Sequence, residues 1–334
     1  MFELLGLSLL LAALLTFNSL ASLIMTGLWR VAGRFTNDWT AASRARLLFS
    51  FRTLPAIIAL LAVTLLLVPS YLTFEPRHTA EPVSLKLGLL ALLSATGIAL
   101  SIYRGVATRR ATAKLTSDWL QRGRRIEIKG IEIEAWRIEH TFPLIAIIGF
   151  LRPRLFIANQ VLEILTPQEI SAAVAHENGH LSARDNLKRG LLQACRDALL
   201  IIPSGRLLDK AWSGASEEAA DENAACQGNN VALDLASALV KIARSIPEGA
   251  RPTMPAGVFL LGDEETGGIK TRVSRLIALA ATEYRPASGR DLVARLCVWG
   301  PISLLLITLL IAASNPFLLS KVHTLIEHAV FTLR

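Results

Sequence analysis

The chain has 334 residues, of which 52% are hydrophobic, and it carries a formal net charge of +8. Its mean hydropathy of +0.45 is high for a soluble enzyme and indicates membrane spans. The three cysteines, Cys195, Cys226 and Cys297, lie far apart and form no C-x-x-C. This spacing argues against a disulfide framework and a cysteine zinc site, and it fits a reducing compartment.

Long apolar segments predict membrane-spanning helices at about residues 4–28, 54–72 and 85–103. The first segment lacks a basic leading region and is too long for a signal peptide. A fourth span is predicted at 292–314. The chain between the third and fourth spans, residues 104–291, is then a domain on one side of the membrane.

Basic residues are distributed unevenly over the segments that connect these spans. Five lie between the first two spans and seven follow the third, but only one lies in the loop 73–84. Because positively charged segments stay on the cytoplasmic side, we expect a multi-pass plasma (inner) membrane protein with a cytoplasmic 104–291 domain and extracytoplasmic termini. The same bias explains the net charge, so we expect membrane lipid and no nucleic acid as a partner.

The predicted cytoplasmic domain begins with strands and continues with helices. Apolar and charged residues alternate over 125–139, which predicts a β-hairpin turning at Gly130. Further strands are predicted at 142–150 and 154–158, and helices follow from Thr166. Strands followed by helices indicate an α+β fold.

Beyond the first of these helices the pattern predicts more helices, a loop and a tail. The predicted helices are 204–228, 231–246 and 269–281, and the Gly/Pro-rich segment 247–268 is a predicted loop. The tail, residues 315–334, has an apolar stripe. It suits either an amphipathic helix on the outer membrane surface or a helix packed against the spans.

A helix is predicted to begin at Thr166, which can form a capping box with Glu169. This helix carries His176, Glu177 and His180, an H-E-x-x-H pattern. The two histidines lie one turn apart on the same side, so they can bind one zinc ion, and Glu177 lies beside them to act on water. The alternative is a pair of ordinary helix histidines.

A zinc enzyme needs a third protein ligand and an open position for water. Glu217 lies 37 residues after His180, enough chain for one helix, a turn and the start of a second helix beside the first. Asp221 shares a face with Glu217 and can accept the free ring N–H of a ligand histidine, and Asp185 is a second candidate for that role. The competing acids on the same helix are Glu218 and Glu222.

Two further expectations concern the substrate. An extended peptide could pair with an edge strand, for which 142–150 is the candidate. His140 could hold the substrate or the oxyanion, although a plain strand histidine is the alternative. The histidines that the predicted orientation places outside the cell, and therefore away from this site, are His78, His323 and His328.

This set of motifs resembles the gluzincin membrane zinc metallopeptidases. Two groups of that kind are similar, the β-lactam sensor-transducers of the BlaR/MecR type and the prenyl-protein and heat-shock membrane endopeptidases. Both carry an H-E-x-x-H helix, an Asp soon after it and a later Glu-x-x-x-Asp. The matching residues here are His176, Glu177, His180, Asp185, Glu217 and Asp221.

The sensor-transducers are similar over residues 1–314, including three spans, a zinc domain and a fourth span. They also share a Gly-x-x-x-Pro turn, here Gly149 to Pro153, and a proline and tryptophan before the third ligand, here Pro203 and Trp212. The chain departs from them in having about twenty residues after the fourth span and no S-x-x-K motif. β-Lactam sensing is therefore not expected.

The resemblance implies an α+β zinc metallopeptidase domain embedded in a four-helix transmembrane protein. Its expected activity is zinc-dependent cleavage of a cytoplasmic or juxtamembrane protein in signalling, with a transcriptional repressor or another regulatory protein as a candidate substrate. The alternatives are a non-catalytic zinc-containing transducer or scaffold, and a membrane quality-control protease.

Overall fold

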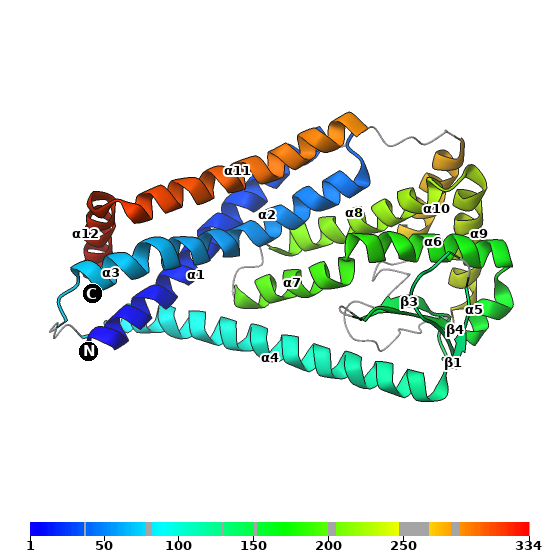
Figure 1. Ribbon diagram of the computed structural model, residues 1–334, viewed down its shortest axis with the longest axis horizontal. Helices are drawn as coiled ribbons and strands as arrows, with labels where there is room; N and C mark the ends of the chain where they lie inside the picture. Colours follow the sequence, from blue (N-terminus) through cyan, green and yellow to red (C-terminus); the bar gives the residue numbers. More distant parts are fainter. Residues whose placement is uncertain are drawn as a thin grey trace.

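The computed structural model describes residues 1–36, 38–77, 82–128, 130–149, 152–199, 205–246, 267–281 and 288–333. The protein is mostly helical, with one small sheet. Long helices form one end of the molecule and the sheet lies at the other (Figure 1).

Three helical segments are long and apolar enough to cross a membrane: Phe2–Thr36, Ala41–Phe74 and Leu85–Arg122. They contain the predicted spans. Their elements are α1 (Phe2–Ala32), the 3₁₀ turn η1 (Gly33–Thr36), α2 (Ala41–Ala62), the π-helical turn η2 (Val63–Leu67), α3 (Val68–Phe74) and α4 (Leu85–Arg122). Large apolar side chains on α1 stay exposed, among them Leu4, Leu20 and Leu23, as a surface facing lipid requires.

The helix α4 continues without a break well past the predicted end of the third span at residue 103. Hydropathy marks where a helix leaves lipid, but not where the helix ends, because backbone hydrogen bonds continue equally well in water. The seven basic residues after the third span therefore lie mainly on this long helix. It reaches from the membrane bundle to the sheet (Figure 1).

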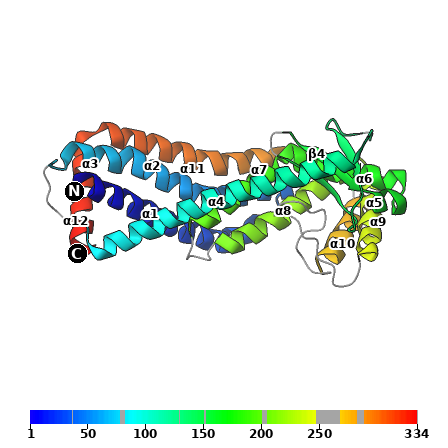
Figure 2. The same ribbon diagram turned by 90° about the horizontal axis from the view of Figure 1, so that it is seen from below.

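The last two helices form a bent pair. They are α11 (Ser288–Ser314) and α12 (Pro316–Leu333), and the chain bends by 93° between Ile302–Ser314 and Pro316–Leu333. Counting this pair as one span gives four candidate spans among the described residues, and otherwise three. Both views place α12 at the end of the bundle remote from the sheet (Figure 1 and Figure 2).

The tail helix α12 packs against the spans, as one of the two sequence alternatives had it. Ile326 and Val330 join a cluster with Leu9 of α1 and Val63 of η2. The hydroxyl of Ser70 also donates a hydrogen bond to the Leu319 carbonyl, with an O–O distance of 2.9 Å.

The sheet contains four strands in the order β1-β2-β4-β3. They are β1 (Arg124–Ile126), β2 (Ala135–Ile138), β3 (Ile145–Ile148) and β4 (Arg154–Ala158). The predicted hairpin is present, with Arg124 opposite Arg137, but the loop between its strands is much longer than a tight turn at Gly130. β2 and β4 are parallel, whereas β3 pairs antiparallel with β4 and forms the edge.

Helices follow the strands in sequence, which agrees with the predicted α+β order. They are α5 (Asn159–Ile164), α6 (Pro167–Ala183), α7 (Asp185–Ala198), α8 (Gly205–Ala225), α9 (Asn229–Ser245) and α10 (Gly267–Ala281). Buried sheet residues such as Phe156 and Ile157 share one core with Ala173 of α6 and Leu239 of α9. Of the predicted loop 247–268, residues 247–266 lie outside the described residues, and the last two residues begin α10.

The helix α8 lies against α2, so the predicted cytoplasmic domain is joined to the membrane bundle. Trp212 and Leu208 of α8 pack with Leu48 of α2. Arg52 of α2 is 2% exposed and places its Nε 2.9 Å from Oδ1 of Asp209. Such a buried cation needs its partner, since removing one member of the pair leaves an uncompensated charge.

Candidate metal centre

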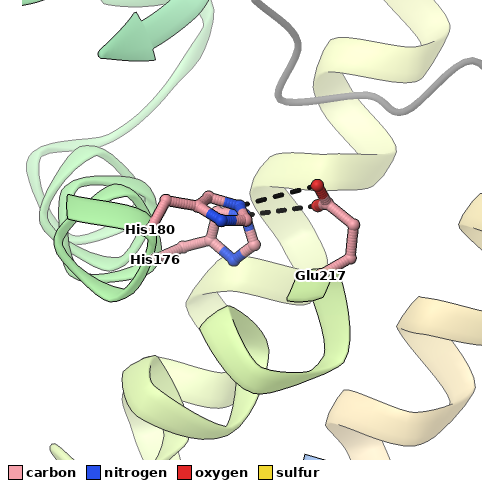
Figure 3. Close-up of side chains that lie close together, drawn as sticks. All are labelled: His176, His180 and Glu217. Atoms are coloured by element: carbon pink, nitrogen blue, oxygen red, sulfur yellow. Dashed lines mark ion pairs between the residues drawn. The ribbon is translucent and has the colours of Figure 1, made fainter. Parts of the chain in front are cut away.

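Three side chains from two neighbouring helices converge in the α+β part of the protein. His176 and His180 extend from α6, and Glu217 faces them from α8 (Figure 3). Nε2 of His176 lies 3.6 Å from Oε2 of Glu217, and Nε2 of His180 lies 3.5 Å from Oε1. One ligand atom from each residue lies within 4.8 Å of the others, so this group could hold a metal ion. The structure thus brings together the three residues predicted from the sequence as ligands.

The spacing of these atoms suits a shared cation better than direct hydrogen bonds. Distances of 3.5 Å and above are long for a hydrogen bond. Neighbouring ligands of a tetrahedral zinc ion lie about 3.3 Å apart, given bonds of about 2.0–2.1 Å. Nε2 of His180 and Oε2 of Glu217 are buried and have no hydrogen-bond partner within the described ranges. Two imidazoles and a carboxylate also form a donor set that zinc accepts, so the residues present fit the ion.

The close approach of α6 and α8 depends on Gly179, which lies between the two histidines on α6. A Cβ at this position would lie 2.9 Å from Cα of Ala220 and 3.2 Å from its Cβ. A glycine inside a helix costs roughly 0.8–1.0 kcal/mol relative to alanine. The absence of a side chain here lets α8 approach closely enough for Glu217 to reach the imidazoles.

Two aspartates, Asp185 and Asp221, lie behind the imidazoles, where the sequence predicts acceptors for their ring N–H groups. Nδ1 of His180 donates a hydrogen bond to Oδ2 of Asp185 at 2.8 Å. Arg184, in the left-handed region at φ 55°, separates α6 from α7 and turns Asp185 back toward the ring. Nδ1 of His176 lies 2.9 Å from Oδ1 of Asp221. With Nδ1 directed at a carboxylate, each ring has its Nε2 facing Glu217.

Glu177 is buried beside the two histidines and contacts the sheet. Its Oε2 accepts a hydrogen bond from the Ile147 N–H at 3.2 Å, and Ile147 lies on the edge strand β3. Burial raises the pKa of the Glu177 carboxyl, although the two histidines oppose this shift. β3, which lies in the segment predicted to pair with a substrate, is therefore next to the two histidines.

The carboxylates around His176 and His180 favour the protonated, positively charged form of both rings. Burial lowers the pKa of His180, but Glu217 and Asp185 outweigh it and raise the pKa to about 10. The pKa of His176 is also raised: burial again opposes the shift, and Asp221 and Glu217 produce it. The pKa of Glu217 falls well below its usual value, since His180 outweighs the effect of burial. A divalent cation would occupy the same negative potential and displace the ring protons.

Two arginines that the sequence did not suggest complete the surroundings. Arg272 of α10 binds both carboxylate oxygens of Asp221, at 3.0 and 2.7 Å, and its Nη1 lies 3.3 Å from Oε2 of Glu217. Arg189 of α7 donates to Oε1 of Glu217 at 3.2 Å. The only available signal was positive charge on an amphipathic helix, and a chain rich in arginine offers many such positions.

The remaining candidates lie apart from this group. The Phe142 N–H donates to Nδ1 of His140 at 3.0 Å, and the imidazole packs edge-on against Trp119 with ring centroids 5.7 Å apart. Among the described residues, the contacts of His140 are thus with a loop and with α4. Glu218 pairs with Arg44, and Glu222 accepts from the Ala41 N–H at 3.0 Å, so these competing acids hold α2 instead. His78 lies outside the described residues.

No protein-family model matches the chain, and neither the search of curated proteins nor that of solved structures returned a match. The resemblance to the gluzincin membrane peptidases therefore stays a prediction from the motifs.

Proposed function

We propose that this chain is an integral-membrane, zinc-dependent endopeptidase that cuts a cytoplasmic or juxtamembrane segment of another protein. The observation that carries the proposal is the arrangement of four side chains around one point. His176, His180 and Glu217 direct ligand atoms at it, and Glu177 lies buried on α6 beside the two histidines. This combination is typical of metallopeptidases with an H-E-x-x-H helix and a separate glutamate.

Zinc is the proposed ion, because two neutral imidazoles and one carboxylate suit it and leave a fourth position open. When bound, zinc supplies the Lewis acidity that activates water and polarises a carbonyl group. Asp185 and Asp221 keep the two rings in the tautomer that can bind it.

Two side chains of the protein, Glu177 and Arg272, would transfer the water proton and stabilise charge at the site. Glu177 would accept a proton from water on its carboxylate and pass it to the leaving amine, and burial raises the pKa of this carboxyl above its usual range. Arg272, whose guanidinium contacts Glu217 and Asp221, would keep these two carboxylates ionised and in position.

The substrate would bind as an extended strand along the outer edge of β3, where it would displace the two side chains that now bind the main chain of Ile147. Ile147 directs both main-chain groups outward there: its N–H reaches Glu177 and its carbonyl accepts from Asn186 at 2.8 Å. Ile145 has the same outward direction, because alternate residues of an antiparallel strand point to the same edge. Main-chain pairing at this edge would supply affinity with little demand on sequence.

Replacement of the Glu177 carboxylate by an amide tests the proposal. Glu177→Gln keeps the size of the side chain, and we expect it to retain zinc and fold but to abolish cleavage. The measurement is a comparison of newly formed protein termini in cells with the wild-type or the variant chain. Glu163→Gln, an exposed position on α5, is the control. Equal processing by Glu177→Gln and wild type would refute the proposal.

The same variants separate the rival functions. A zinc-containing scaffold would tolerate Glu177→Gln in every cellular assay but would lose thermal stability in His176→Ala. A membrane quality-control protease would show loss of cleavage at many unrelated proteins, whereas a signalling protease would show it at one or a few.

A further inference from the structure

A second group of metal-binding side chains lies at the opposite end of the molecule. Glu75 directly follows α3, and His323 and Glu327 lie one turn apart on α12. One ligand atom from each lies within 4.8 Å of the others. Figure 1 shows α3 and α12 meeting at the end of the bundle remote from the sheet.

His323 differs from an ordinary helix histidine. Its side chain is 20% exposed, and its Nδ1 is buried without a hydrogen-bond partner in the described part of the chain. The nearby His328 instead contacts the Thr324 carbonyl through Nδ1 at 3.0 Å, one turn earlier on α12. A buried polar atom without a partner is costly, and an ion bound at this nitrogen would remove that cost.

The carboxylates complete a donor set of one imidazole and two carboxylates. Nε2 of His323 lies 4.0 Å from Oε1 of Glu327, and Glu75 is 8% exposed. Tetrahedral ligands lie about 3.3 Å apart, so closing the group around an ion needs a movement of about 1.5 Å at most. The half-exposed side chain of Glu327 has the freedom to make that movement. One imidazole with two carboxylates favours zinc and similar transition metals over calcium or magnesium, which prefer oxygen alone.

We propose that Glu75, His323 and Glu327 form a binding site for a divalent transition-metal ion, separate from the H-E-x-x-H centre. The ion fastens α12 to the end of α3, two segments that lie far apart in the sequence. In the predicted orientation this end faces outward from the cell, so the site would sample external metal. The inference does not rest on the proposed peptidase activity, because the two sites share no residue.

The test counts zinc in the full-length protein, purified in detergent, exposed to excess Zn²⁺ and then freed of unbound ion by gel filtration. We expect His323→Ala and Glu327→Gln to hold one zinc ion fewer per chain than wild type, by elemental mass spectrometry. His328→Ala, on the same helix, is the matched control and should hold as many as wild type. Equal zinc in His323→Ala and His328→Ala would overturn the proposal.

Two details keep this test decisive. Glu327→Gln changes a half-exposed side chain by one atom, so it reports on the site even where His323→Ala disturbs folding. Loss of zinc from this end leaves the other centre occupied, whereas failure of the H-E-x-x-H centre lowers the count in all variants alike. An equal concentration of Mg²⁺ in place of Zn²⁺ should leave all the chains indistinguishable, and a Mg²⁺ response like that of Zn²⁺ would contradict the donor set.

Discussion

Gly179→Ala adds a single methyl group at the contact between α6 and α8, behind the metal centre. The new Cβ would lie 2.9 Å from Cα of Ala220, where carbon atoms in contact normally stand about 3.5–4.0 Å apart. The helices must therefore separate by roughly 0.6–1.1 Å at this level. Glu217 is carried on the same stretch of α8, so it moves away from the imidazoles.

The expected loss follows from this movement. Metal–ligand distances tolerate about ±0.2 Å, which the displacement exceeds several-fold. Overpacking of this kind costs typically 1–3 kcal/mol, against roughly 0.8–1.0 kcal/mol gained in helix propensity. We expect zinc affinity to fall at least tenfold, while the stability of the metal-free protein falls by about 2 kcal/mol or less.

Competition with a chromophoric chelator measures the affinity, and thermal unfolding without metal measures the stability. Gly214→Ala is the control, because Gly214 lies on α8 with no atom within 4 Å of the added Cβ. That change should leave zinc affinity unaltered and slightly raise the melting temperature. Wild-type zinc affinity in Gly179→Ala would refute the link between this close packing and the metal centre.

Three further outcomes are expected. Asp185→Asn weakens the acceptor for Nδ1 of His180 and should lower zinc affinity about 10–100-fold in the same competition assay. Asp234→Asn on α9 is the control, and an unchanged affinity in Asp185→Asn would contradict the orienting role of Asp185. Zinc affinity should rise with pH, about tenfold per unit for one displaced proton, because the pKa of His180 in the metal-free protein is raised to about 10. Zinc titrations at pH 6, 7 and 8 would measure this rise, and an affinity independent of pH would contradict the prediction. Glu169→Gln should lower the melting temperature at pH 7, since hydrogen bonds outweigh burial and lower the pKa of Glu169 to about 2. Because this folded-state pKa lies below the unfolded value, the carboxylate stabilises the fold above about pH 4.5. The difference in melting temperature between variant and wild type should therefore shrink as the pH falls toward 2.

The grouping of His176, His180 and Glu217 was predictable, because its signals are local or depend on helix lengths. Thr166 and Glu169 do form the capping box that begins α6. The spacing from His180 to Glu217 worked because the intervening chain folds as one helix and a connection, which returns α8 alongside α6.

What the sequence could not reveal depends on contacts between distant segments. Arg272 reaches Asp221 from a helix about fifty residues further along the chain, and no pattern marks it among the other arginines. Arg52 was counted as a cytoplasmic loop charge, yet it is buried in an ion pair between α2 and α8. The predicted orientation places His323 outside the cell, but the sequence does not group it with Glu75, because that residue lies in a distant segment.

The attachment of α8 to α2 gives the metal centre a mechanical link to the bilayer. Adjacent residues of one helix face in different directions: Glu217 faces the histidines and Glu218 pairs with Arg44 of α2. A sliding or tilting of α2 in the membrane would therefore pull on the helix that carries the third ligand. We expect bilayer thickness to change the geometry at the metal, so that the lipid environment would become a control on the chemistry.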